Sequence, residues 1–339
     1  MADQELKVNP VIQLILDRLR SESHPLQRKD GYKLGLAIEG GAMRGVVSAG
    51  MVTALEYLGL LRVFDAVYGS SAGAFNGAFF LAGQAAFGTT IYYEDINNQN
   101  FIDFKRLLIG KPIASLEYII ETVLPREKVL DWKAVLDSPI PLNIVASSLK
   151  TLSFQVLRDF KTKDSLFAAL HASSKMPLVA GSPVRINGDR FLDASVFEAV
   201  PINAALQDNC THVLVLLTRP EGQLKQPHLF DREIIAPRLD RLRNGLGSSY
   251  LNSNNVYNRT LKFIHEAESD PTESPFISSL TLPPGYPDVR KTEKNKDRLI
   301  SAAVEGMKAV FGRLGDDEIS IIEVLTPFGK GGHVYRLPL

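Results

Sequence analysis

The chain has 339 residues, of which 45% are hydrophobic and 22% charged, and its 38 basic side chains balance 38 acidic ones. This composition is typical of a folded globular protein, and a net charge of zero argues against a nucleic-acid binder, which usually carries a basic face. A single cysteine, Cys210, excludes an intramolecular disulfide framework and any metal site built on paired cysteines.

Residues 1–30 are expected to form an N-terminal helical extension. Ile12, Ile15, Leu16 and Leu19 fall on one helical face, which favours a helix docked on the domain, with a membrane-surface helix as the alternative. Acidic residues come early and no cleavage site follows an apolar core, so we do not expect a signal peptide. No stretch approaches the ~18 apolar residues of a membrane-spanning helix. With the lone cysteine, this favours a cytoplasmic location, and peripheral membrane contact stays open.

From residue 31 onwards, apolar strand patterns alternate with helical ones, which predicts a three-layer α/β fold with a mostly parallel sheet flanked by helices. Strands are predicted at 33–38, 63–69, 141–148, 152–158, 211–218 and 319–326, and helices at 46–60, 72–84, 164–173, 231–266 and 293–313. We expect one domain over 31–339, with a C-terminal helical and strand region from 220. Two stretches are expected to be excursions: an insertion at 86–140 and the Pro- and Ser-rich segment 267–292.

The stretch 69–73, GSSAG, matches the pattern G-x-S-x-G with Ser71 at its centre. It follows a predicted strand and precedes a predicted helix, which is the setting of a sharp turn that exposes a nucleophilic serine. Gly69 and Gly73 fit such a turn because side chains there would collide. Ser70 has Tyr68 two residues before it, so the pattern selects Ser71. A glycine-rich helix entry without chemistry is the alternative.

A second glycine-rich turn, IEGGAMRG at 38–45, also lies between a predicted strand and a helix. It lacks the lysine and the spacing of the common phosphate-binding loops. Backbone N–H groups of such a turn can instead stabilise the oxyanion that forms when a serine attacks an ester. Parallel strands would bring both glycine turns to the same edge of the sheet.

The base that would activate Ser71 is not marked by any histidine motif. None of the six histidines lies in a characteristic pattern, and His212 begins a strand, which is the wrong end for this site. An acid is the alternative, since Asp193 follows the strand-like residues RFL and precedes small residues.

The stretches IEGGAMRG, YGSSAG and FLDAS, in that order, resemble the three signatures of the patatin-like phospholipase family. The stretches at 172–188 and 198–202 also resemble the family pattern, and the similarity runs from about Lys33 to Thr218. Region 86–140 looks more like the bacterial-type members. The resemblance implies lipid acyl hydrolysis by a Ser–Asp dyad that uses no histidine, and we expect catalysis without a metal or other cofactor.

By this resemblance Ser71 is the nucleophile, Asp193 is its base, and Gly40, Gly41 and Ala42 form the oxyanion hole. Two positions depart from the family pattern: Ala42 replaces a third glycine, and Ala194 replaces the glycine that usually follows the aspartate. The expected substrate is a lipid ester, as for a phospholipase A or lysophospholipase. An ordinary Ser–His–Asp esterase and a non-catalytic lipid-binding relative stay open as alternatives.

Arg44 has two candidate roles, contact with a substrate phosphate or an ion pair with a carboxylate. The apolar residues within 75–81 are candidates for an acyl-chain slot or for plain core. The aromatic residues within 92–104 are candidates for a lid or for a packed insertion.

Overall fold

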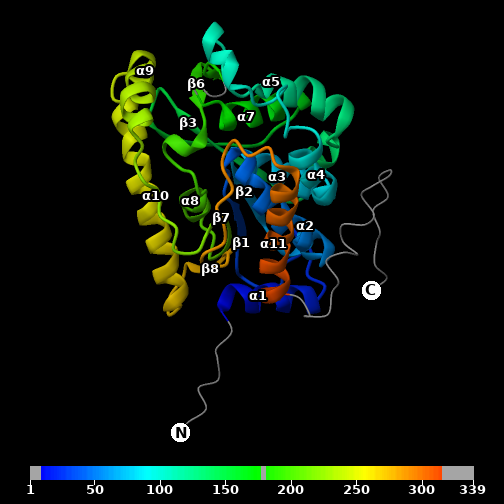
Figure 1. Ribbon diagram of the computed structural model, residues 1–339. Coiled ribbons are helices and arrows are strands. Elements are labelled where there is room, and N and C mark those ends of the chain that lie inside the picture. Colours follow the sequence, from blue (N-terminus) through cyan, green and yellow to red (C-terminus); the bar gives the residue numbers. More distant parts are fainter. Residues whose placement is uncertain (1–8, 177–180, 315–339) are drawn as a thin grey trace.

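The computed structural model describes residues 9–176 and 181–314, and its framework is a central sheet of eight strands (Figure 1). The strand order is β5-β6-β3-β2-β1-β7-β8, with β4 also paired to β3. Strands β3, β2, β1, β7 and β8 run parallel to their neighbours in that series, whereas β4 and β6 run antiparallel to β3. The strands are β1 Leu34–Ile38, β2 Ala66–Ser70, β3 Leu142–Ser148, β4 Ser153–Leu157, β5 Val184–Ile186, β6 Asp189–Leu192, β7 His212–Pro220 and β8 Phe276–Leu282.

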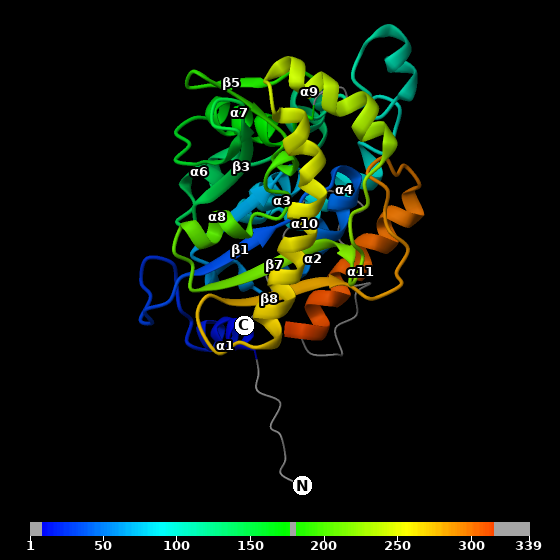
Figure 2. The same cartoon turned by 90° about the vertical axis from the view of Figure 1, so that its left-hand side faces the viewer.

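Helices cover both faces of this sheet, so the predicted three-layer α/β fold is confirmed (Figure 2). In Figure 2, α8 and α10 lie in front of the sheet, and α2 and α11 lie behind it. The helices are α1 Pro10–Arg20, α2 Val46–Tyr57, α3 Ala72–Leu81, α4 Ala85–Glu94, α5 Leu116–Tyr118, α6 Trp132–Asp137, α7 Lys163–Ser174, α8 Ile202–Gln207, α9 Ala236–Leu242, α10 Leu246–Ser269 and α11 Lys296–Leu314. None of the helices in the described ranges has the length and apolar character that a bilayer-spanning segment requires.

Alternate residues of the strands face opposite helical layers. Leu34, Leu36 and Ile38 of β1 belong to the core cluster that includes residues of α2, α3 and α11. Ala37, between two of them, belongs to the cluster that includes residues of α8 and α10. Side chains alternate across a strand, so a strand covered on both faces reads as a continuous apolar run. This explains why β1 is uniformly buried.

Two strands meet end to end along one edge of β3. Strand β2 pairs in parallel with Leu142–Val145 of β3, and β6 pairs antiparallel with Ser147 and Ser148. Strand β4 pairs with residues 144–148 of β3 and therefore takes the other edge. The last residues of β2 and β6 thus approach each other from opposite directions. The residues that follow these two strands are Ser71 and Asp193.

The N-terminal helix docks on the domain. Ile12 and Ile15 are buried in the core, which is the first of the two placements considered for this helix. Arg18, on the same helix, is buried and forms ion pairs with Asp30 and Asp65. These contacts tie the segment after α1 to the amino end of the sheet.

Three predicted segments differ from the structure or lie outside it. The helix predicted at 231–266 is two α-helices, because Arg243 is extended and Gly245 has a φ of 85°. The segment 267–292 was expected to be an excursion, and this is wrong in part, since residues 276–282 form β8 beside β7. The strand predicted at 319–326 lies outside the described residues.

Candidate active site

Ser71 lies on a strained turn between β2 and α3, with φ 53° and ψ −125°. Few residues other than glycine adopt a positive φ. A Cβ on Gly69 would lie 2.4 Å from Ala74 Cα, and one on Gly73 would lie 2.2 Å from the Ile38 carbonyl oxygen. The sequence therefore needs glycine on both sides of the serine for the chain to turn this sharply.

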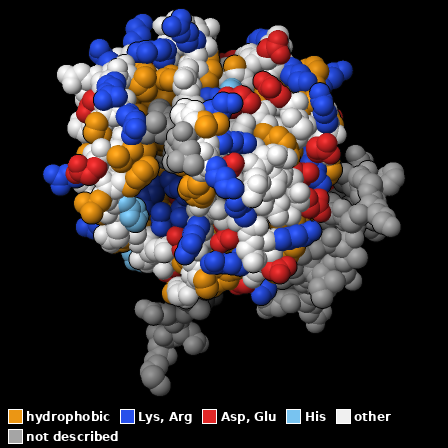
Figure 3. Space-filling model, turned by 45° about the horizontal axis from the view of Figure 1, so that its top comes forward, with side chains coloured by type: hydrophobic (Ala, Val, Ile, Leu, Met, Phe, Trp, Pro, Cys, Tyr) orange, Lys and Arg blue, Asp and Glu red, His pale blue; other side chains and the backbone are white. Residues whose placement is uncertain are grey.

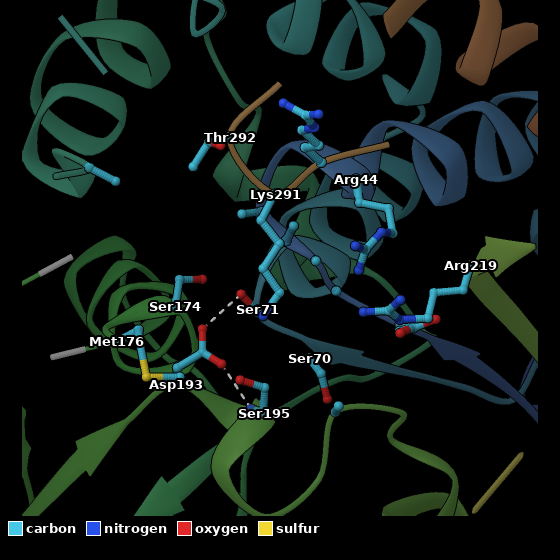
Figure 4. Close-up of a pocket in the computed structure, with 18 of the residues that line it drawn as sticks. Arg44, Ser70, Ser71, Ser174, Met176, Asp193, Ser195, Arg219, Lys291 and Thr292 are labelled. Carbon is cyan, nitrogen blue, oxygen red and sulfur yellow. Dashed lines mark hydrogen bonds between the residues drawn. The ribbon is translucent and has the colours of Figure 1, made fainter. Parts of the chain in front are cut away.

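The hydroxyl of Ser71 donates a hydrogen bond to Asp193 Oδ2 at 3.0 Å (Figure 4). The other carboxylate oxygen, Oδ1, accepts from the Ser195 N–H at 2.8 Å. Ser147 Oγ donates to the backbone carbonyl of Asp193 at 2.8 Å, and the Asp193 N–H donates to the Lys175 carbonyl at 3.2 Å. Asp193 is only 7% exposed, so the carboxylate is held in one orientation with little access to bulk water.

The backbone of the serine turn is also held by hydrogen bonds. Ser173 Oγ accepts from the Ser71 N–H at 2.8 Å and itself donates to the Val145 carbonyl at 2.5 Å. Ser70 Oγ points away from the dyad and donates to the Glu198 carbonyl at 2.9 Å. The two adjacent serines therefore have different partners, and the support given by Ser173 had no signal in the sequence.

The glycine turn after β1 packs directly against Ser71. A Cβ on Gly40 would lie 2.2 Å from the Ser70 carbonyl oxygen and 2.8 Å from Ser71 Cβ. Ala42 has a φ of 52°, a left-handed conformation that glycine adopts at less cost. Among the described residues, no hydrogen bond from the N–H of Gly40, Gly41, Ala42 or Ala72 to a protein acceptor is present. Ala72, the residue after the serine, was not singled out from the sequence.

Arg44 is held in an ion pair beside this turn. Its Nε lies 2.8 Å from Asp288 Oδ1 and donates to the Val289 carbonyl at 3.0 Å. The Met43 N–H donates to the Lys291 carbonyl at 3.3 Å. Of the two roles considered for Arg44, the structure shows the ion pair. Residues 288–291 therefore anchor the glycine turn from a part of the chain far away in sequence.

Ser71, Asp193 and the glycine turn line one cavity of about 870 Å³. This volume lies within the range of ~300–1,000 Å³ that is usual for ligand pockets. Much of the lining is apolar and comes from α3, α4 and residues 96–124: Phe75, Phe79, Ile91, Tyr92, Ile96, Phe101, Ile102, Ile113, Leu116, Ile119 and Leu124. Phe80 and Leu81 are buried in the core instead, and Phe104 is 56% exposed outside the cavity.

One histidine of the described residues, His228, lines the cavity. His171 contacts Lys175 Nζ at 2.8 Å, and its pKa is lowered by burial. His212 lies at the start of β7 between the rings of Tyr32 and Phe276, where burial lowers its pKa to about 4. His333 is outside the described residues. Asp193, and no histidine in the described ranges, accepts the hydrogen bond from Ser71 Oγ.

Other polar residues of the cavity were missed by sequence reasoning. Lys291 and Thr292 reach it from the segment between β8 and α11, while Arg219 and Lys225 reach it from the end of β7 and the loop that follows. Within the described ranges, no group of three or more His, Cys, Asp or Glu side chains is arranged to hold a metal ion.

The chain is similar to known proteins over part of its length. The family model for patatin-like phospholipase matches residues 36–206. An uncharacterized protein of Escherichia coli (strain K12), YjjU, is 25% identical over 203 residues, which cover 59% of this chain and 56% of that protein. The chain therefore spans little more than half the length of this curated relative. The crystal structure of VipD from Legionella pneumophila aligns with 84% of this chain and 67% of its own, at 11% identity and a TM-score of 0.41.

The matched region encloses the glycine turn, the serine elbow and Asp193, and it takes up half of the chain. On this basis the chain belongs to the patatin-like phospholipase family.

Proposed function

We propose that the protein is a lipid acyl hydrolase in which Ser71 is the nucleophile and Asp193 is the general base. The observation that supports this most is the hydrogen bond of 3.0 Å from Ser71 Oγ to Asp193 Oδ2 inside a largely apolar cavity. A serine hydroxyl needs an adjacent base to become a useful nucleophile. Oδ1 of Asp193 already accepts a hydrogen bond from the Ser195 N–H, so Oδ2 is oriented towards the hydroxyl of Ser71.

In the proposed mechanism, Asp193 removes the Ser71 proton as Oγ attacks the ester carbonyl carbon. The N–H groups of the turn at 40–42 and of Ala72 stabilise the oxyanion, a contribution that typically amounts to ~10²–10³ in rate for each donor. The protonated Asp193 then transfers its proton to the leaving alkoxide as the carbon–oxygen bond of the ester breaks. Water, deprotonated by the same carboxylate, then attacks the carbonyl carbon of the acyl-serine. As the bond to Ser71 Oγ breaks and the fatty acid leaves, the protonated Asp193 returns its proton to Oγ.

The apolar part of the cavity fits an acyl chain. Phe75 and Phe79 of α3 and Ile91 of α4 lie on the same lining as Ser71, and residues 96–124 extend this surface. An acyl chain that packs against this lining desolvates few polar groups and gains about 0.8 kcal/mol for each buried methylene group. This supports activity of the phospholipase A or lysophospholipase type.

The test is a panel of esters with varied acyl chains and headgroups, together with a fluorophosphonate probe that labels activated serines. The wild type should be labelled and should hydrolyse long-chain esters, and Ser71→Ala should do neither. An active Asp193→Asn variant together with an inactive His228→Ala variant would favour the ordinary serine–histidine esterase instead. A wild type that is folded, unlabelled and inactive would favour a lipid-binding relative without catalysis.

We also propose that the cavity opens onto a lipid surface. Leu224 and Phe230, each 50% exposed, line the cavity, and Leu229 beside them is 78% exposed. Figure 3 shows apolar and basic side chains gathered around a hollow on this face. Leu229→Asp should slow hydrolysis of vesicle lipids while sparing a soluble ester. Leu26→Asp, at a leucine 86% exposed in the N-terminal segment, is the matched control.

A further inference from the structure

Cationic side chains outnumber carboxylates by one on the lining of the active-site cavity. The cations are Arg44, Arg219, Lys225, Arg290 and Lys291, and the carboxylates are Glu39, Asp193, Asp231 and Asp288. Asp288 forms ion pairs with both Arg44 and Arg219. Its Oδ1 lies 2.8 Å from Arg44 Nε, and its Oδ2 lies 3.6 Å from Arg219 Nη1. Among the described residues, no carboxylate lies within ion-pair distance of Lys225 or Lys291. Figure 3 shows Lys and Arg side chains inside the hollow.

Lys291 extends from the segment that anchors the glycine turn towards Ser71 and Asp193 (Figure 4). More than a third of its surface is accessible, and its side chain lines the cavity. Burial lowers the pKa of Lys291, the charges of Arg44 and Arg219 add to this change, and the charges of Asp193 and Asp231 oppose it. The positive charge of the Lys291 ammonium group is therefore poorly compensated by the charged groups of the protein.

Lys225 is held in place on the same cavity. Its backbone N–H donates to Asn258 Oδ1 at 2.9 Å, and its carbonyl accepts from Asn258 Nδ2 at 3.1 Å. Its Nζ lies 3.9 Å from the centre of the Tyr257 ring, a cation–π contact that fixes the direction of the side chain. Burial, together with the charge of Lys291, lowers the pKa of Lys225 to about 7. Nε of Arg219 is also buried and has no hydrogen-bond partner among the described residues.

Cations in such a setting are stabilised by an anion that brings its own charge and acceptor oxygens. Apart from Arg44, the cationic lining comes from residues 219–225 and 288–292, whereas most of the apolar lining comes from α3, α4 and residues 96–124. A ligand that satisfies both has an acyl chain and a separate anionic group, with the ester between them. A released fatty acid does not meet this description, because its charge lies on the reacting carbon itself.

We propose that Lys225 and Lys291 bind the phosphate group of a glycerophospholipid or lysophospholipid substrate. This inference rests on the proposed function, since it names the substrate class of the same site. It places the phosphate contacts on residues that lie outside the matched family region 36–206. Phosphate-containing esters are then preferred over neutral glycerides with the same acyl chain.

The test compares lysophosphatidate with the monoacylglycerol of the same acyl chain, because the two differ only in the phosphate. In Lys291→Gln and Lys225→Gln, the ratio of the two kcat/KM values should fall about tenfold or more, mainly through the KM for lysophosphatidate. Lys291→Arg should keep most of the preference. Lys133→Gln, at an exposed lysine on α6 that does not line the cavity, should keep all of it. An unchanged ratio in both cavity variants would overturn the proposal.

Three further readouts separate the remaining outcomes. Labelling of Ser71 by an uncharged fluorophosphonate shows that the site is assembled in each variant. If the wild type hydrolyses neither ester, calorimetry measures the binding of lysophosphatidate to Ser71→Ala and to Ser71→Ala/Lys291→Gln. Binding that is lost in the double variant supports the phosphate subsite although the hydrolase proposal fails. Equal binding to the two variants overturns the subsite. If inorganic phosphate inhibits through the lysines while the preference for lysophosphatidate does not depend on them, the site binds free phosphate and the headgroup proposal is wrong.

Discussion

Ser71 and Asp193 are 122 residues apart in the chain, yet their side chains are joined by one hydrogen bond of 3.0 Å. The sheet brings them together, because β2 and β6 share one edge of β3 and run towards each other along it. The serine follows one strand and the aspartate follows the other. Their distance is therefore set by backbone pairing in the centre of the molecule and not by a mobile loop.

Replacing Asp193 by Asn should abolish most turnover while the fold persists. The Asn side chain can still accept from the Ser195 N–H, but it cannot take the proton of Ser71. Loss of a general base typically lowers the rate by about 10²–10⁴-fold. The measurements are kcat on a long-chain ester and thermal unfolding, with Asp137→Asn as the control at an exposed carboxylate on α6. Substantial residual activity in Asp193→Asn would contradict the dyad.

The conformation of Ser71 predicts a conflict between stability and activity. At φ 53° a side chain costs energy that glycine avoids, so Ser71→Gly should be more stable than Ser71→Ala, by about 1 kcal/mol. Both variants lack the nucleophile and should be inactive. Urea denaturation of the two proteins measures the difference. If Ser71→Ala proved the more stable of the two, the turn would carry no such strain.

The sequence predicted the parts of the site that depend on local chain geometry. Glycines around a serine between a strand and a helix indicate a sharp turn, and the structure has one at Ser71. Lys291 and Ser173 gave no such signal, because each acts through a contact with a residue far away in the chain. No rule of short-range spacing could have placed them at the site.

The errors in the fold have similar physical causes. Strand β8 contains three hydroxyl residues among its seven, FISSLTL, and this polarity favours a surface excursion over a buried strand. Ser278 is fully buried and donates to Glu268 Oε1 at 3.1 Å, and Ser279 Oγ donates to Oε2 at 2.7 Å, so tertiary partners satisfy these polar groups. The break at Gly245 did have a local signal, since glycine readily ends a helix. It was outweighed by the helical pattern on either side.

The ion pair between Arg44 and Asp288 should matter for stability as well as for the glycine turn. Arg44 is 5% exposed, so removing the charge of its partner leaves a buried cation poorly compensated. Asp288→Asn should lower the free energy of unfolding by about 3 kcal/mol and slow the labelling of Ser71 by fluorophosphonates. Glu266→Gln, which removes an exposed partner of Lys262 at 3.5 Å, is the control and should cost less than about 0.5 kcal/mol. Equal effects of the two substitutions would contradict this role of Arg44.

Glu198 should make the stability of the protein fall as the pH rises from about 4.5 to about 7. Glu198 is 3% exposed, and burial raises its pKa from 4.5 to about 7, although hydrogen bonds from Asn203 oppose the change. Between these two values the folded protein keeps a proton that the unfolded chain has lost, so the free energy of unfolding decreases with increasing pH. Above pH 7 this decrease in the free energy of unfolding is complete and amounts to about 3 kcal/mol.

Glu198→Gln removes this titration, and the amide of Asn203 can rotate to keep its hydrogen bonds with the new side chain. Compared with the wild type, the variant should therefore be more stable at pH 8 and about equally stable at pH 4, where Glu198 is neutral in both states. Urea denaturation at the two pH values measures the difference. Because the Glu198 carbonyl accepts from Ser70 Oγ, the ionised side chain weakens a segment that supports the serine turn. A gain in stability that is the same at both pH values would mean that the substitution acts through packing and not through the charge.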